Sequence, residues 1–487
     1  MNATNGDPLP HGKAEEVGMS SERLGEIEKV IKADIEKGRL PGAVIAVARK
    51  GKLVYYEAFG FRDKAAGVPM TKDTIFNIAS MTKPMAALAA LQLQERGKLL
   101  TDDPLSKYFP KFAEMKVAVL DPKGETIAAT VPAERPITLR HLMMHTSGLV
   151  YGGRGNTAVH KLYPGGSGVA GGQMNGAEFM DKLAELPLLN QPGAVWDYGF
   201  GLDLLGQVVE KVSGQMLGKY FEENITKPLG MTDTAFFIPP EKAARYARAL
   251  PVDPDTRIAQ NVTPVLTQPL KFECGGGGLS STVSDYMRFA LALLNKGAYG
   301  ETRILGRKTA EYMLTNQMGP EVKNLIANAD PTRADYGFGL GLAVQHRSRA
   351  RQADRLARRL QLAGRERHQL VGRSEGTARG RVHGALAGPD PLALPAGDQR
   401  AGLSGDRGLA RRSPSCTARR APYRLRRGRA RDRKNFAYIG RQHLAKGCRV
   451  ARLRPAPVPK NAQGLAQRLV PIVHASNPQR IPMKPQS

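Results

Sequence analysis

The chain has few cysteines, no long apolar run and a polar N-terminal segment. Its three cysteines are Cys274, Cys416 and Cys448, and they show no paired spacing. This pattern excludes a disulfide framework and a cysteine-based metal site. No apolar run approaches the roughly 20 residues needed to span a bilayer. The first 16 residues are polar and do not resemble a secretory signal. We therefore expect a cytoplasmic protein with no metal or other cofactor.

Acidic residues are scarce in only one part of the chain. The whole sequence carries 72 Lys and Arg against 44 Asp and Glu, a formal net charge of +28. Residues 346–487 contain 33 of the basic residues and only seven of the acidic ones. A strongly basic protein ordinarily suggests nucleic acid or an anionic membrane surface as a partner. Because residues 1–345 are close to neutral, we expect no specific nucleic-acid or membrane partner for them.

Two interpretations of residues 346–487 remain open. The segment is rich in Arg, Ala, Gly and Pro, and its apolar residues have no periodicity. It is either a disordered basic extension that binds polyanions or the product of a GC-rich gene read out of frame, which we favour. With suitable codons, residues 389–398 shifted by one base read Gln-Ile-His-Trp-Arg-Phe-Gln-Pro-Glu-Ile, a sequence more typical of a folded protein. Codon degeneracy permits this reading without proving it.

The apolar pattern of the first 345 residues predicts an α+β fold. Residues 21–38 have apolar side chains at helical spacing, whereas residues 42–48 and 52–59 are β-rich runs that form a hairpin. A helix followed by an antiparallel pair favours α+β over a βαβ series. Strong helix formers predict a helix over residues 80–100, and further patterns predict a helix over 284–296 and a strand over 336–344.

A chain of 487 residues with 41% apolar composition can bury a large core, and its length suggests two or three structural units. Residues 1–20 form an N-terminal extension, and residues 21–100 form the first part of a sheet domain with the helix that begins at Ser80. A largely helical region is inserted at 101–270. Residues 271–345 return to the sheet domain, and 346–487 are the Arg-rich tail. The expected architecture is an antiparallel sheet flanked by helices.

Ser80 and Lys83 are the first candidate catalytic residues. Ser80 is the only serine followed by Lys three positions later, and it lies where the helix is predicted to start. A separation of three residues places both side chains on one face of the first turn. The helix N-terminus favours the negative charge that develops on an attacking hydroxyl. The alternative is an N-cap serine followed by a solvated lysine.

Four segments in a fixed order resemble the class C β-lactamase and penicillin-binding-protein superfamily of serine hydrolases. Within it they are most similar to the family VIII carboxylesterases and related acyl-transferring enzymes, over about residues 15–345. The segments are residues 77–83 (NIASMTK), residues 142–149 (LMMHTSGL), Pro192-Gly193 with Trp196 and Tyr198, and residues 276–282 (GGGLSST).

The resemblance implies a β-lactamase-like fold and a catalytic trio. Ser80 would be the nucleophile, Lys83 its activating partner, and Tyr198 the general base and then acid. A tyrosine with the ordinary pKa near 10 is a poor base, but an adjacent ammonium lowers that pKa. Phe200 stands where a β-lactamase has an asparagine that helps to hold the lactam side chain. An ester substrate is therefore favoured over a lactam.

Other candidates have simpler explanations. Tyr336 begins a local repeat of the text around Tyr198 but lacks the preceding Pro-Gly-x-x-Trp, so we interpret it as part of a strand of the main sheet. His141 and His145 lie in a predicted helix end and turn, where such side chains satisfy backbone groups. Ser374 lies in a G-x-S-x-G match inside the tail, with no convincing strand before it.

The third motif of the family is missing. It should lie within residues 346–390, on the last strand of the sheet, and supply the second oxyanion-hole N–H. The chain offers only Val382-His383-Gly384, which does not fit. Three hypotheses remain: a carboxylesterase acting on short-chain acyl esters through Ser80; a catalytically impaired product with a polyanion-binding tail; and a β-lactamase or D-peptidase. We favour the first, with a small-molecule ester as the partner.

Overall fold

The computed structural model describes residues 7–254, 257–260, 267–326, 336–345 and 473–474. The tail predictions therefore lie almost entirely outside the described residues. This holds for Ser374, for Val382-His383-Gly384 and for the proposed shift of reading frame. The two described tail residues form a short strand, β14 (Val473–His474).

A four-stranded antiparallel sheet with the order β14-β1-β2-β3 forms one layer of the fold. Its centre is the predicted hairpin, in which β1 (Gly42–Arg49) pairs with β2 (Lys52–Asp63). The chain reverses at Lys50 and Gly51, which both have positive φ, as a tight hairpin turn requires. β3 (Val68–Pro69) extends the other edge of β2.

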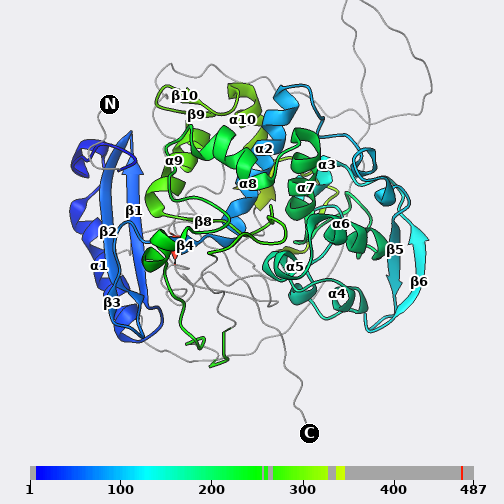
Figure 1. Cartoon of the computed structure of the whole chain (residues 1–487), viewed down its shortest axis with the longest axis horizontal. Coiled ribbons are helices and arrows are strands. Elements are labelled where there is room, and N and C mark those ends of the chain that lie inside the picture. The colour runs from blue at the N-terminus through cyan, green and yellow to red at the C-terminus, as the bar shows by residue number, and fades with distance from the viewer. Residues whose placement is uncertain (1–6, 255–256, 261–266, 327–335, 346–472, 475–487) are drawn as a thin grey trace, which may run out of the picture. The chain divides into compact units, whose positions relative to one another are not determined.

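Strand β1 is buried on both faces and contributes side chains to the hydrophobic clusters on each side. Ala43 and Ile45 pack with Ile31 of α1 (Ser21–Glu36), which lies along the sheet in Figure 1. Val44 and Ala46 point to the opposite face and join the main core. This alternation follows from the two-residue period of a strand. The predicted helix over 21–38 is confirmed, with the Ser20 side chain accepting a hydrogen bond from the Arg23 N–H.

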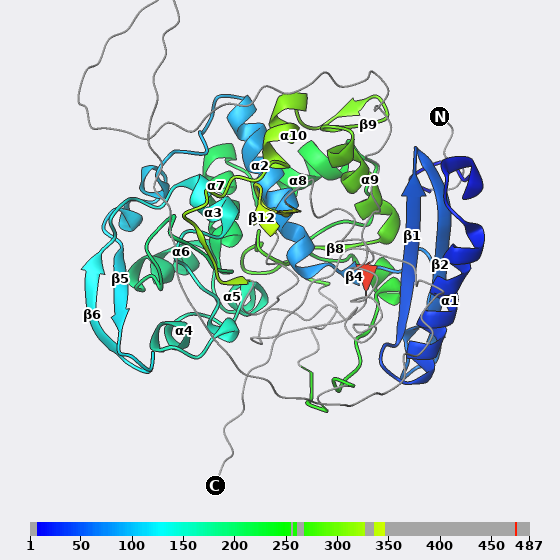
Figure 2. The ribbon, with the colours of Figure 1, turned by 180° about the vertical axis from the view of Figure 1, so that it is seen from behind.

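A mainly helical region packs around α2 (Lys83–Glu95) and α7 (Gly201–Ser213), which contact each other. Most of the α2 side chains are buried. Figures 1 and 2 both place the hairpin β5–β6 beyond α4 and α6, at the outer edge of this region. The other elements between α2 and α7 are α3 (Leu139–Met144), α4 (Ala158–Leu162), α5 (Ser167–Gln173), α6 (Gly176–Glu185), β5 (Lys116–Leu120), β6 (Ile127–Pro132) and β7 (Val195–Trp196).

The chain then returns to the sheet layer through short strands and the predicted helix, α9 (Val283–Leu294). β8 (Ser280–Ser281) pairs with β4 (Phe76–Asn77), which brings the glycine-rich segment beside the predicted nucleophile. The remaining elements are α8 (Leu217–Phe221), β9 (Ala298–Tyr299), β10 (Thr302–Arg303), α10 (Arg307–Met313), β11 (Lys323–Asn324), β12 (Tyr336–Phe338) and β13 (Ala343–Gln345). Within the described ranges, no helix has the length and apolar character of a membrane span.

Two sequence predictions need correction. The helix predicted over 80–100 is shorter: a 3₁₀ turn spans Ala79–Thr82, the α-helix begins at Lys83, and it ends at Glu95. The strand predicted over 336–344 is a separate two-stranded hairpin of β12 and β13, and not part of the main sheet. The sequence indicates extended backbone here but does not specify which strand is the partner.

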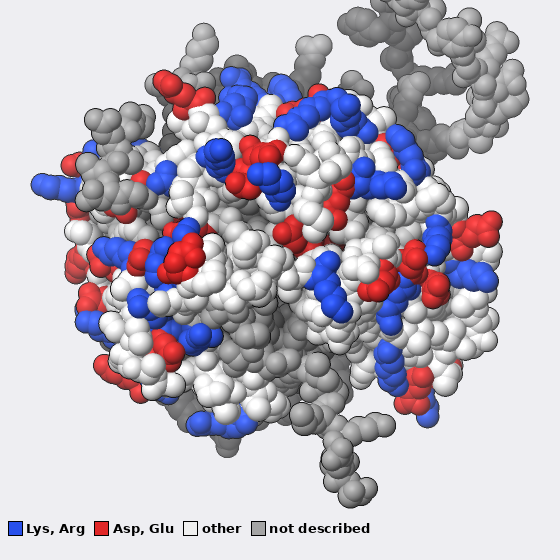
Figure 3. Space-filling model, viewed as in Figure 1, with Lys and Arg blue, Asp and Glu red and all other residues white. Residues whose placement is uncertain are grey.

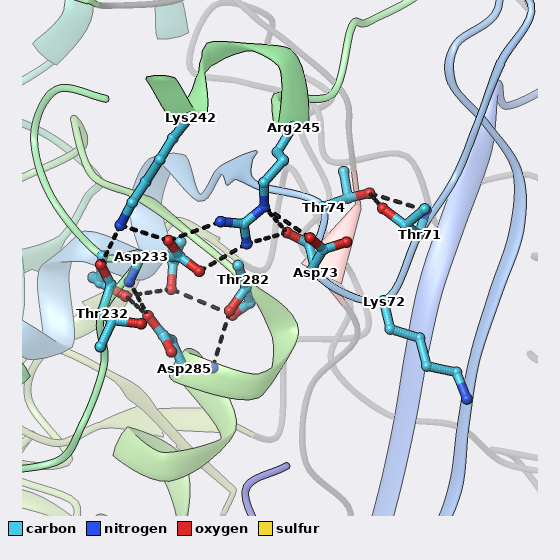
Figure 4. Close-up of polar contacts among 12 residues, drawn as sticks. Thr71, Lys72, Asp73, Thr74, Thr232, Asp233, Lys242, Arg245, Thr282 and Asp285 are labelled. Carbon is cyan, nitrogen blue, oxygen red and sulfur yellow. Dashed lines mark hydrogen bonds and ion pairs between the residues drawn. The ribbon is translucent and has the colours of Figure 1, made fainter. Parts of the chain in front are cut away.

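A polar network ties the loop segment 232–245 to the segment after β3 and to α9 (Figure 4). The Arg245 guanidinium bridges Asp233 at 2.7 Å and Asp73 at 2.9 Å. Lys242 adds an ion pair with Asp233 at 2.8 Å. The Asp233 N–H donates to the Asp285 carboxyl at 2.8 Å. Because Asp285 lies in the first turn of α9, the network fixes the loop against that helix.

Candidate active site

The predicted nucleophile lies on a turn that neighbouring side chains clamp. Ser80 is the second residue of the 3₁₀ turn, and the turn begins with Ala79 at a φ of 41°. The Asn77 side chain accepts a hydrogen bond from the Ala79 N–H at 2.8 Å. The Thr82 hydroxyl donates to the Ala79 carbonyl and accepts from the Gly278 N–H. These bonds hold a left-handed conformation that a non-glycine residue rarely adopts.

Lys83 is buried beside Ser80. Its ammonium donates to the Ser80 hydroxyl oxygen at 3.1 Å and to the Gly276 carbonyl at 2.5 Å. Only 2% of the residue surface is exposed. Because a buried ammonium is costly without partners, these contacts fix its position. The predicted pairing of Ser80 and Lys83 is therefore present in the structure.

Tyr198 is brought to the same place from a distant part of the sequence. The Lys83 nitrogen lies 4.5 Å from the centre of the Tyr198 ring. The Arg154 guanidinium lies 4.8 Å from the same ring centre. The three residues that the sequence singled out thus form one cluster, at the first turn of α2 and just before α7.

Sequence reasoning missed Asp203, which organises the interior of the site. This residue on α7 is fully buried, and its carboxylate accepts hydrogen bonds from the Tyr151 hydroxyl at 2.9 Å and the Ser167 hydroxyl at 3.0 Å. It also accepts from the Gly276 N–H at 3.0 Å. Asp203 therefore positions Gly276, the residue whose carbonyl holds Lys83. The available signal was an acidic residue inside the apolar run 202–212.

His141 and His145 serve the two ends of α3, as the turn interpretation predicted. His141 completes a capping box with Thr138, and burial lowers its pKa to about 4. His145 follows the helix with a φ of 57°, and its Nδ1 accepts a hydrogen bond from the Gly199 N–H at 3.4 Å. Burial, followed by the charges of Lys83 and Arg154, lowers the pKa of His145 well below its usual range.

The competing tyrosine occupies a different position. Tyr336 begins β12 and pairs with Gln345 across the hairpin. In this hairpin Phe338 carries the contacts to the site: its ring packs against His145 and Trp196 with centroids 5.5 and 5.4 Å apart. Among the described residues, the Lys83 ammonium lies near the tyrosine rings of Tyr198 and Tyr151.

Phe200 is turned away from the site into the core. It is fully buried and packs its ring against Tyr151 and Phe179. A side chain in this position offers no amide or hydroxyl to a substrate. Among the described residues, no group of three or more His, Cys, Asp or Glu side chains is arranged to hold a metal ion.

Known proteins resemble the chain over the part that contains this site. The profile of the family described as Beta-lactamase matches residues 27–372. Esterase EstB of Burkholderia gladioli is 32% identical over 57% of this chain and 71% of its own length. Acyltransferase mokF of Monascus pilosus is 33% identical over 68% of this chain and 84% of its own. The solved structure titled "EstCE1, a hydrolase with promiscuous acyltransferase activity" has a TM-score of 0.54 at 26% identity, covering 68% of this chain and 85% of that one.

Proposed function

The chain belongs to the β-lactamase family of serine hydrolases, and from this premise we propose that it is a carboxylesterase that acts through Ser80, Lys83 and Tyr198. The observation that carries the proposal is the cluster itself. The Lys83 ammonium contacts the Ser80 hydroxyl and lies against the Tyr198 ring. Each group has one part of the chemistry that ester hydrolysis needs.

In the proposed mechanism Tyr198 moves protons while Ser80 forms the covalent bond. The Lys83 ammonium stabilises negative charge on the tyrosine oxygen, which allows it to accept the Ser80 proton. The serine oxygen then attacks the ester carbonyl carbon, and Tyr198 returns the proton to the departing alcohol. Tyr198 then takes a proton from water, whose oxygen attacks the acyl carbon. The bond from that carbon to the Ser80 oxygen breaks, and Tyr198 returns the proton to that oxygen, which restores the free hydroxyl.

One oxyanion-hole donor in this mechanism is the Ser80 backbone N–H, which the 3₁₀ turn orients. The second donor would come from the third motif, whose expected place at 346–390 lies outside the described residues. Removal of one donor typically lowers turnover by about a hundredfold to a thousandfold. The identity of this second donor therefore determines how active the full chain is. Reading the gene in all three frames around codons 342–347 tests whether that motif was lost.

Phe200 supports an ester substrate over a β-lactam or a D-peptide. Because its ring is buried in the core, the position cannot hydrogen-bond a substrate amide. We propose short-chain acyl esters as substrates. p-Nitrophenyl butyrate is the assay substrate, and nitrocefin, a chromogenic lactam, is the comparison. Faster turnover of nitrocefin than of the ester would favour the lactamase hypothesis.

The nucleophile assignment is tested with Ser80→Ala. We expect loss of p-nitrophenyl butyrate hydrolysis and of labelling by a fluorophosphonate probe, because both need the serine oxygen. Ser106→Ala in the 3₁₀ turn Leu105–Lys107 is the matched control and should retain both. Labelling that persists in Ser80→Ala would end the assignment. A folded full-length chain with no activity in the wild type would favour the catalytically impaired product.

Acyl transfer to an alcohol is a second candidate. The mokF relative is named an acyltransferase, and EstCE1 is described as a hydrolase with promiscuous acyltransferase activity. An acyl-serine can react with either water or an alcohol. Product analysis of p-nitrophenyl butyrate reactions with added small alcohols distinguishes the two. Butyrate as the main product supports the esterase, and a butyrate ester as the main product supports the transferase.

A further inference from the structure

A half-buried arginine lies beside the proposed general base. Arg154 is the last residue of the short 3₁₀ turn η5 (Gly152–Arg154), and its guanidinium carbon lies 4.8 Å from the Tyr198 ring centre. Lys83 lies 4.5 Å from the same centre. The site therefore contains a second cation that the proposed proton transfers do not use.

The Arg154 guanidinium has no anionic partner in the part of the chain that the structure describes. No carboxylate within residues 7–254, 257–260, 267–326 or 336–345 forms an ion pair with it, and its contact there is with the Tyr198 ring. Asp197 is near enough for Arg154 to oppose the rise in its pKa that burial causes, but the two do not pair. A half-buried cation loses part of its hydration, so an unpaired one favours a negatively charged ligand.

The charge of Arg154 acts on the interior of the site. Burial is the main cause of the lowered pKa values of His145 and His160, and Arg154 lowers both further. The surface shows no such imbalance on the face in Figure 3, where basic and acidic side chains are interspersed among the described residues. Lys83 and Arg154 place two positive charges beside Tyr198.

The backbone beneath Arg154 is held in place. The Gly152 N–H donates to the Pro164 carbonyl at 2.8 Å, and the Gly153 N–H donates to the Gly165 carbonyl at 3.2 Å. A Cβ added at Gly152 would lie 2.2 Å from the Tyr163 carbonyl oxygen, so only glycine permits this approach. The fixed backbone and the contact of the guanidinium with the Tyr198 ring both restrain Arg154, which lowers the entropic cost of binding a ligand.

We propose that Arg154 binds a carboxylate of the substrate, so that the preferred substrates are esters that carry a free carboxylate in addition to the reacting ester bond. This inference rests on the proposed esterase function and narrows its substrate class. A guanidinium matches a carboxylate through two parallel hydrogen bonds. Such a contact would orient the substrate with its ester carbonyl toward Ser80.

A matched pair of substrates tests the proposal on the full-length chain. The mono-p-nitrophenyl ester of glutaric acid carries a carboxylate where p-nitrophenyl pentanoate carries a methyl group. We expect the wild type to have a higher kcat/KM for the glutarate ester. In Arg154→Gln the ratio of the two kcat/KM values should fall by about tenfold to a hundredfold, as for loss of a hydrogen bond to a charged group, with the change mainly in KM for glutarate. Arg154→Lys should retain part of the preference.

The controls separate this contact from other effects. Lys161→Gln removes a nearby exposed charge and should leave the ratio unchanged. If Arg154→Gln lowers activity equally on both substrates and shifts the pH profile, Arg154 acts on Tyr198 and the carboxylate proposal is wrong. A wild type without preference for the glutarate ester also overturns it. Hydrolysis of pentanoate that requires Ser80 would preserve the esterase function in either case, whereas no Ser80-dependent hydrolysis of either ester would overturn that function as well.

Discussion

The imidazole of His145 stacks on the phenol ring of Tyr198, with ring centroids 4.2 Å apart and planes inclined by 26°. His145 also receives the N–H of Gly199, the residue that follows the tyrosine. His145 directly follows the last residue of α3. The position of Tyr198, the proposed base, therefore depends on where that helix ends. We infer that His145 acts as a positioning residue for Tyr198.

Replacing His145 by Asn tests this role. Asn tolerates the left-handed conformation at this position, but it removes the stacked ring. We expect kcat to fall about threefold to tenfold, as for loss of one aromatic pair. The pH–rate profile near pH 6.5 should keep its shape, because burial holds the pKa of His145 well below its usual value of 6.5. Loss of an inflection near pH 6.5 in the variant would instead identify His145 as a titrating catalytic group.

Tyr198 and Tyr336 lie in similar sequence segments, but we expect the substitution of each by Phe to have a different effect on ester turnover. Tyr198→Phe should lose most ester turnover with little change in thermal stability, because it removes only the phenol oxygen from a ring beside Lys83. Tyr336→Phe should retain near-wild-type turnover, because Tyr336 belongs to the β12–β13 hairpin. The measurements are kcat on p-nitrophenyl butyrate and the melting temperature. The reverse pattern would transfer the proton-transfer role to Tyr336.

Asp203→Asn should weaken both the fold and the activity. One side-chain oxygen of Asp203 accepts hydrogen bonds from the Tyr151 and Ser167 hydroxyls. The other oxygen accepts one from the Gly276 N–H. With the amide oxygen toward Gly276, the nitrogen faces two hydroxyls that have lost their charged acceptor. With the oxygen toward the hydroxyls, the nitrogen faces the Gly276 N–H and leaves a buried donor unsatisfied, at a cost of about 1–3 kcal/mol. We expect a lower melting temperature and at least a tenfold loss of turnover, since Gly276 holds Lys83. Asp181→Asn on the exposed face of α6 is the control for loss of a carboxylate and should change neither.

The raised pKa of Asp285 predicts that the stability of the folded chain depends on pH. Burial raises the pKa of this carboxyl from 3.8 to about 6. The folded chain therefore binds this proton more tightly than the unfolded chain, so the contribution of Asp285 to stability falls as the pH rises from about 4 to 6. Asp285→Asn stays neutral, and its amide oxygen can receive both bonds that one carboxyl oxygen now accepts, from the Asp233 N–H and the Thr234 hydroxyl. Figure 4 shows the first of these two bonds.

The variant should therefore gain stability relative to the wild type across this window, by up to roughly 3 kcal/mol for a shift of about two pKa units. Melting temperatures of both proteins at pH 4, 5, 6 and 7 measure the gain. The same difference at every pH would show that Asp285 does not titrate in this range.

The sequence predicted the local elements because their determinants are local. The periodic apolar residues of 21–38 and the β-rich runs around Lys50 and Gly51 led to the right helix and hairpin. The predicted start of α2 was too early, because contacts from Asn77 and Thr82 stabilise a 3₁₀ turn before the α-helix. Helix propensity does not indicate such a turn. The tail predictions remain predictions, since those residues lie almost wholly outside the described ranges.

By itself the sequence determined the pairing of Ser80 with Lys83, because a separation of three residues fixes their proximity on one helical turn. Only the tertiary structure decided what surrounds them. Lys83 reaches a carbonyl 193 residues away, and Asp203 reaches the N–H of the same glycine from another helix. Sequence distance carries no information about such contacts. The packing of α2, α3 and α7 brings them together, and burial then requires each charged or polar group to find a partner.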